Sequence, residues 1–362
     1  MNITFLVGNG FDINLGLQTS YKDFYKWYIK QESSDENIKK IKEYIKEDIQ
    51  DNNGEKWSDL EAALGECTGE FDNFEGFFNC HIDITKKLRE YLKEEEKKFN
   101  LENISEKQLD DMRKSLLNFY KGLRDEDYNQ FYNLLENDIK NRSSFINFIS
   151  FNYTFALDNI VKKMSEKSLK LATNSNNIQY SFGVNKKVIH VHGFLDDSPI
   201  LGVNDESQVK NKALFENTYF KGLIIKEEAV NIKRTDWQRR AENIIKNSNI
   251  ICIYGMSLGN TDYKWWELIK GWLSIADNRY LIIYLRIKDN ELNFEHPVEE
   301  QMKIDEGKAL FFRHFGNIEQ SQIDELAKRV FVIFNSENIL NIPVEKETQK
   351  VTTEKQLQEA TI

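Results

Sequence analysis

The sequence predicts an α/β protein with a mostly parallel sheet and a large α-helical insertion. Short apolar runs alternate with segments of helical periodicity, as is typical of strands joined by helices. Two of the apolar runs pass directly into glycine-containing turns. A long block between the first two runs is rich in Lys and Glu and shows only helical spacing. These observations favour a Rossmann-like arrangement of strands.

The chain opens with a predicted strand, a glycine turn and a helix. Residues 3–7 (ITFLV) form a short apolar run that stops at Gly8. This start indicates a first strand rather than a signal peptide. Thr19 or Ser20 is placed to cap the next helix, in which aromatic residues recur at helical spacing over 21–28.

Residues 31–140 form the helical block, which contains no proline. We therefore assign residues 1–30 and 141–340 to the Rossmann-like domain and 31–140 to a helical insertion or lobe. Residues 341–362 are polar and predict a flexible tail. The segment 57–61 (WSDLE) marks the start of one helix in the block. It either packs with its tryptophan in the core or reaches over a ligand site as a lid.

The remaining apolar runs predict the rest of the sheet. They are residues 145–151, 188–191, 200–203, 250–254, 280–287 and 330–334. The run 250–254 (IICIY) is apolar on both faces, which suits a central parallel strand. Helical spacing predicts helices over 235–248 and 262–275 on either side of that run.

Charge and composition exclude several classes of protein. The 362 residues include 49 Lys and Arg against 59 Asp and Glu, a net charge of -10. This charge argues against nucleic acid as the main partner. No apolar stretch is long enough to cross a membrane as a helix. Three cysteines without a CxxC pair fit a reducing compartment, so we expect a cytoplasmic protein.

The first candidate ligand site is the turn Gly8-Asn9-Gly10, followed by Asp12. Glycines after a strand let the backbone approach a phosphate or ribose. The dinucleotide fingerprint GxGxxG is not met, because Ile13 stands where its third glycine belongs. Asp12 would repel a phosphate, so a ribose hydroxyl or an amide is a better partner. The alternative is an ordinary strand-to-helix turn capped by Asp12.

Asn152 and a pair of histidines follow two further predicted strands. Ligands of doubly wound sheets bind beyond the carboxyl ends of strands, so Asn152 is placed to reach one. Capping the next helix is its alternative role. His190 and His192 share one face of a strand, but no third ligand at a recognised spacing supports zinc. His192, beside Gly193, is the better catalytic candidate, and we expect His190 to pack more deeply.

A second glycine turn, GMSLGNTD, follows the run 250–254. Gly255, Ser257 and Thr261 would supply backbone N–H groups and hydroxyls for the ribose and phosphates of a nucleotide. A capped turn is the alternative, since Thr261 or Asp262 also suits a helix N-cap. The four motifs all follow strands of one predicted sheet, and this convergence favours a nucleotide-type site.

Six motifs occur in a recognisable order: GNGFDINLGLQTSYKDF, WSDLE, FNYT, HVHG, LGVND and YGMSLGNTDYKWW. In this order they resemble the AbiH-type abortive-infection family of bacterial anti-phage proteins. The resemblance runs from residue 2 to about residue 335. It implies a role in phage defence in which the infected cell is sacrificed. Such an effector must be held inactive until infection, so we expect a phage-derived trigger.

A more distant resemblance concerns the mechanism. A glycine turn after the first strand, an Asn, a His-Gly pair and a Gly-x-Ser-Leu turn are arranged as in sirtuin-like NAD-binding domains. Defence members of that superfamily hydrolyse NAD, and the match implies that Asn152 and His192 are the catalytic pair. The chain departs from sirtuins in its GNGFD turn, in Phe151 at the position of a Gln, and in lacking a zinc ribbon. These departures argue against protein deacylation and leave NAD binding or hydrolysis.

The first hypothesis is an effector that takes NAD as its substrate and releases ADP-ribose and nicotinamide without a metal. His192 would act as a base near neutral pH, and Asn152 would orient a water molecule. Asp12 would bind the carboxamide or stabilise the cationic ring. The alternatives are a nucleotide-sensing module that acts through a partner, and a toxin directed at nucleic acid. The Lys/Glu-rich helices also leave homo-oligomerisation open.

Overall fold

A computed structural model describes residues 1–51, 55, 57–139, 144–167, 169–170, 181–197, 199–287, 294–316, 318–335 and 339–340. Its centre is an eight-stranded sheet with the order β3-β4-β2-β1-β6-β7-β8, in which β5 also pairs with β2. The strands are β1 (Asn2–Val7), β2 (Ser144–Ser150), β3 (Leu169–Lys170), β4 (Ser181–Val184), β5 (Ile189–His190), β6 (Ile250–Tyr254), β7 (Tyr280–Leu285) and β8 (Val330–Phe334). All of these pairs are parallel except β3 with β4, which confirms the predicted fold class.

Strand β1 is central because both of its faces are apolar and buried. Alternate residues point to opposite faces, so Phe5 lies in one hydrophobic core and Leu6 in another. The register pairs Val7 with Ser150 of β2 and with Tyr254 of β6. The carboxyl ends of these three strands are therefore level, and the turns that follow them meet at one edge of the sheet.

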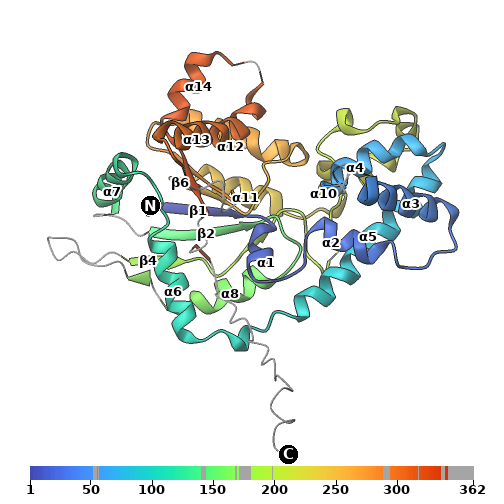
Figure 1. Ribbon diagram of the computed structural model, residues 1–362, viewed down its shortest axis with the longest axis horizontal. Coiled ribbons are helices and arrows are strands. Elements are labelled where there is room, and N and C mark those ends of the chain that lie inside the picture. Colours follow the sequence, from blue (N-terminus) through green and yellow to red (C-terminus); the bar gives the residue numbers. More distant parts are fainter. Residues whose placement is uncertain are drawn as a thin grey trace, which may run out of the picture.

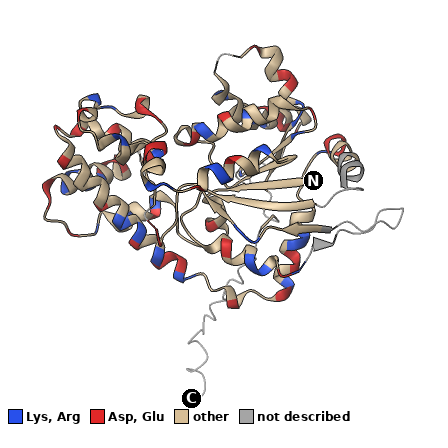
Figure 2. Ribbon diagram, turned by 180° about the vertical axis from the view of Figure 1, so that it is seen from behind, with Lys and Arg blue, Asp and Glu red and all other residues tan. Residues whose placement is uncertain are grey.

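Helices cover both faces of the sheet and extend beyond this edge (Figure 1). Between β1 and β2 lie α1 (Gly10–Asn14), α2 (Tyr21–Tyr28), α3 (Glu36–Asp51), α4 (Leu60–Cys67), α5 (Phe74–Lys97), α6 (Glu106–Leu117) and α7 (Asp125–Ile139). After β2 come α8 (Ala156–Met164), α9 (Phe220–Ile224), α10 (Lys226–Lys233), α11 (Trp237–Lys246), α12 (Tyr263–Ile275), α13 (Pro297–Phe312) and α14 (Gln320–Ala327). Figure 2 shows basic and acidic residues mixed along the helices, while the central strands contain neither.

The buried apolar residues form three clusters. One lies on each face of the sheet, and α6 contributes Leu116 to the first of these. The third cluster is formed by the helices α2, α3, α4 and α5 together with residues between 195 and 225. It includes Phe24, Leu64 and Phe220. Helices of the segment between β1 and β2 thus divide between the sheet core and this third cluster, which we call the helical core.

The structure corrects several sequence predictions. Residues 200–203 are not a strand, because this run packs in the helical core and pairs only through an isolated bridge from Val203 to Ile225. Strands β3 and β4 were not expected. The predicted strand 280–287 ends at Leu285. The predicted tail, 341–362, lies outside the described residues. Within the ranges given above, no helix is both long and apolar enough to cross a membrane.

Candidate functional site

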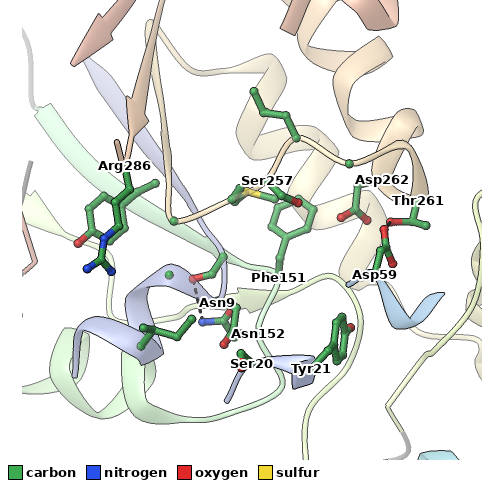
Figure 3. A pocket seen from close by; sticks show the side chains of 18 of the residues that line it. Asn9, Ser20, Tyr21, Asp59, Phe151, Asn152, Ser257, Thr261, Asp262 and Arg286 are labelled. Atoms are coloured by element: carbon green, nitrogen blue, oxygen red, sulfur yellow. Dashed lines mark hydrogen bonds between the residues drawn. The ribbon is translucent and has the colours of Figure 1, made fainter. Parts of the chain in front are cut away.

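A cavity of about 780 Å³ lies at the carboxyl ends of β1, β2, β6 and β7. Strand β1 has β2 on one side and β6 on the other, so the cavity lies where the strand order reverses. This is the usual ligand position in open α/β sheets. The cavity-lining residues include eight of the nine predicted site residues: Gly8, Asn9, Gly10, Asn152, His192, Gly255, Ser257 and Thr261. Figure 3 labels Asn9, Asn152, Ser257 and Thr261 among them.

The two glycine turns pack directly against each other. The N–H of Gly8 donates to the Tyr254 carbonyl at 2.9 Å, and that of Gly10 to the Gly255 carbonyl at 2.9 Å. A Cβ on Gly10 would lie 2.6 Å from the Gly255 Cα, and Gly255 itself has φ +66°. These glycines are required for the close approach of two backbone segments. The N–H groups of Gly8 and Gly10 are therefore used in hydrogen bonds within the protein.

Asp12 is the predicted site residue that does not line the cavity. It is 1% exposed, and its carboxylate accepts hydrogen bonds from Asn152 Nδ2 at 3.0 Å and Thr154 Oγ1 at 2.6 Å. Burial raises its pKa to about 6, although these two hydrogen bonds oppose the rise. From the sequence, we expected Asp12 to contact a hydroxyl or amide group of a ligand. The amide it meets is that of Asn152, so Asp12 lies behind the cavity wall.

Asn152 is held at both its backbone and its amide group. Its Nδ2 donates to the Gly8 carbonyl at 3.1 Å and to Asp12, so both amide protons are used. Its backbone carbonyl accepts from His190 Nδ1 at 2.9 Å, and Ser150 Oγ accepts its backbone N–H. Among the described residues, Oδ1 of Asn152 has no hydrogen-bond donor. This oxygen is the atom left to interact with a ligand.

The two histidines have different surroundings. His190 bridges Asn152 and Asp158 Oδ2, at 2.8 Å from the latter, so it supports the site from behind. His192 lines the cavity and packs edge-on against Phe151, with ring centroids 5.4 Å apart. Burial lowers the pKa of His192, and the nearby Lys226 cation lowers it further. His192 is therefore held in the neutral form, which can accept a proton.

A buried ionic cluster adjoins His192. Lys226 Nζ lies 2.7 Å from Glu61 Oε2, 2.9 Å from Asp262 Oδ1 and 3.0 Å from the Thr261 carbonyl. His192 Nε2 lies 3.0 Å from the same Asp262 oxygen, although the two atoms are not aligned as in a hydrogen bond. This Lys226 cluster consists of Lys226, Glu61, Asp262 and His192.

The charges of the Lys226 cluster depend on one another. Burial alone would raise the pKa of Asp262, but Lys226 and then His192 hold it well below its usual value. Burial alone would lower the pKa of Lys226, but Asp262 and Glu61 raise it. Burial raises the pKa of Glu61 above its usual value, and Lys226 only partly offsets this rise. In the Lys226 cluster, the ionised forms of Lys226 and Asp262 stabilise each other, while burial opposes the ionisation of Glu61.

The sequence reasoning missed this cluster because its members come from distant elements. Thr261 or Asp262 was the suggested N-cap. Asp262 does occupy the N-cap position of α12, but its side chain makes no cap hydrogen bond and contacts Lys226 instead. Asp59 caps α4 through Oδ1 and accepts from Thr261 Oγ1 through Oδ2 at 3.2 Å. The segment WSDLE was a usable signal, since Asp59 and Glu61 both line the cavity. Trp57 is buried in the helical core.

The other end of the cavity is more open. Figure 3 shows Arg286, which follows β7, on the opposite side from Asp59 and Asp262. Arg286 and Ser257 are both exposed. In the part of the chain that the structure describes, no three His, Cys, Asp or Glu side chains are grouped so as to hold a metal ion.

The fold and the site define an α/β protein with a ligand-sized cavity at the reversal point of a parallel sheet. The chain matches the family model described as "Bacteriophage abortive infection AbiH" over residues 4–284, and it belongs to this family. This confirms the resemblance drawn from the six motifs and supports a role in bacteriophage abortive infection. No curated protein matches the chain.

Proposed function

We propose that this protein acts in abortive infection by hydrolysing NAD to ADP-ribose and nicotinamide. The observation that carries the proposal is that Asn152 and His192 line one cavity at the reversal point of the sheet. Dinucleotides bind across this point in doubly wound folds. The cavity volume of about 780 Å³ also lies within the range of ligand pockets.

The reaction needs little covalent chemistry from the protein. The bond between nicotinamide and C1′ of the ribose breaks, and its electron pair neutralises the cationic ring. Water adds to the resulting oxocarbenium-like centre and loses a proton. His192, held neutral by burial and by Lys226, can accept this proton from the water. Asn152 can orient the same water through Oδ1, because its Nδ2 is fixed by Gly8 and Asp12.

Nicotinamide release tests the proposal directly. Purified wild-type protein is incubated with NAD, alone and with lysate from phage-infected cells. We expect His192→Ala and Asn152→Ala each to lower release by about 10²-fold or more. His296→Ala is the matched control, because His296 is exposed and only caps α13. Thermal unfolding verifies that each variant is folded.

Two results would overturn the proposal. The first is wild-type protein that releases no nicotinamide under either condition. The second is an Asn152→Ala variant that still protects cells while the wild type binds nucleotide without turnover. That second result would instead support a nucleotide-sensing module that acts through a partner.

A further inference from the structure

Glu61 reaches the cavity from a helix outside the sheet. It lies in the first turn of α4, close to the N-cap Asp59. Leu60 and Leu64 anchor this helix in the helical core, where both are fully buried. The side chain of Glu61 is 7% exposed and lines the cavity beside residues that follow β1, β2 and β6.

Only one of the two carboxyl oxygens of Glu61 is satisfied. Lys226 Nζ holds Oε2 at 2.7 Å. Within the described residues, Oε1 is buried and has no hydrogen-bond partner. Buried polar atoms are nearly always paired, and an unpaired one is costly. A ligand in the cavity is the natural source of the missing partner.

The position of Glu61 indicates which part of a ligand it meets. Lys226 contacts both Glu61 and Asp262, and the same Asp262 oxygen lies 3.0 Å from His192 Nε2. Glu61 is therefore linked through these contacts to the proposed base. A group that reaches Glu61 belongs to the reacting end of the ligand.

The chemistry of Oε1 narrows the choice of group. An ionised Glu61 would accept a hydrogen bond through Oε1, and a protonated one would donate through it. A hydroxyl group can do either, so it satisfies Oε1 in both states. The sugar that carries the scissile bond supplies such hydroxyls at the reacting end.

We propose that Glu61 binds, through Oε1, a hydroxyl group of the ribose that carries the scissile bond. This inference rests on the proposed NAD-cleaving function and adds a residue from the helical core to the site. It predicts that replacing Glu61 weakens the binding of ligands that contain this ribose more than the binding of ligands that lack it.

Calorimetric binding of ADP-ribose and of ADP tests the assignment, because only ADP-ribose carries the second ribose. We expect Glu61→Ala to weaken ADP-ribose binding about tenfold or more and to change ADP binding less than about twofold. Glu61→Gln should restore most of the affinity, since its carbonyl can accept from Lys226 and its NH₂ can donate to a hydroxyl. Glu66→Ala is the matched control on the same helix, at a side chain that is 71% exposed.

Glu61→Asp covers the case in which the alanine variant does not fold. It keeps the charge, but it is one methylene too short to reach both Lys226 and the ligand, so it should also weaken only ADP-ribose. An equal loss for both nucleotides, or unchanged ADP-ribose binding in the variants, would overturn the assignment. Wild-type protein that binds ADP-ribose but releases no nicotinamide from NAD would overturn the hydrolytic function and leave the Glu61 assignment standing. Wild-type protein that binds neither nucleotide would overturn both.

Discussion

The effect of replacing Asp12 by Asn on the free energy of unfolding should depend on pH. Compared with wild type, the Asp12→Asn variant should be relatively more stable at neutral pH than at acid pH. Asp12 is 1% exposed, and burial raises its pKa from 3.8 to about 6. The folded protein therefore holds a proton on Asp12 over a pH range in which the unfolded chain has released it. The free energy of unfolding falls as pH rises through this range and then levels off above the folded pKa. Asn cannot ionise, so the free energy of unfolding of the variant does not show this fall with rising pH.

The magnitude follows from the two pKa values. A rise from 3.8 to about 6 corresponds to about 3 kcal/mol between strongly acid and neutral pH. About half of this, roughly 1.4 kcal/mol, falls between pH 5 and pH 8. The altered hydrogen bonds to Asn152 and Thr154 add a further difference, but that difference does not depend on pH. The pH-dependent part of the comparison therefore isolates Asp12.

Urea denaturation of wild type and Asp12→Asn at several pH values between 5 and 8 measures this quantity. The stability of the variant relative to wild type should rise by about 1.4 kcal/mol over that interval. Asp277→Asn, at a fully exposed side chain, measures the effect of removing one surface carboxylate. A difference between Asp12→Asn and wild type that stays flat with pH, or that falls, would refute the reasoning.

The same substitution should impair the proposed reaction. Asn152 Nδ2 and Thr154 Oγ1 both donate to the Asp12 carboxylate, and the amide introduced by Asp12→Asn would offer only one acceptor oxygen. We expect nicotinamide release to fall by about 10²-fold, the cost of a misplaced reacting group. In wild type, release should decline below about pH 6, where Asp12 gains its proton. The Asp12→Asn variant should not show this decline at acid pH. A decline that persists in the variant would show that another group causes it.

Two further substitutions test the packing around the site, and a third tests its charges. Gly255→Ala should lower the free energy of unfolding by about 2 kcal/mol or more, because Gly255 has φ +66° and its Cβ would lie 2.9 Å from backbone atoms. Gly271→Ala, where a Cβ meets nothing within 4 Å, should instead stabilise α12 by up to about 1 kcal/mol in the same denaturation experiment. Lys226→Met should cost about 3–5 kcal/mol, since it leaves two buried carboxyl groups without their cation. A thermal midpoint equal to that of wild type would show that the Lys226 cluster is not buried as described.

The sheet could be predicted where an apolar run is buried on both faces. Residues 250–254 and 330–334 became β6 and β8 with the expected bounds. The run 200–203 has the same local pattern but is buried by helices rather than by neighbouring strands. An apolar run indicates that a segment is buried, but it does not indicate whether strands or helices bury it. Strand β3 has only two residues and leaves no periodicity to detect.

The site could be predicted only in part, for a similar reason. The residues that follow strands were found, because the topology of a parallel sheet brings such turns together. The pairing of Glu61 with Lys226 joins residues that are far apart in the chain, and no local pattern marks it. Asp12 was placed near the site, but its burial behind Asn152 depends on tertiary packing. Sequence therefore indicates which side chains reach the cavity edge, and the packing decides which of them face it.

The contacts of α4 argue that the helical core is a fixed wall of the site rather than a lid. Moving α4 away would separate Glu61 from the buried Lys226 and break the contact between Asp59 and Thr261. Such a movement would remove one of the two carboxyl partners of a buried cation, which is unfavourable. Figure 3 shows the exposed Arg286 on the opposite side of the cavity from Asp59, which caps α4. Glu61 would therefore present its carboxyl group to the proposed ribose hydroxyl from a wall that stays in place.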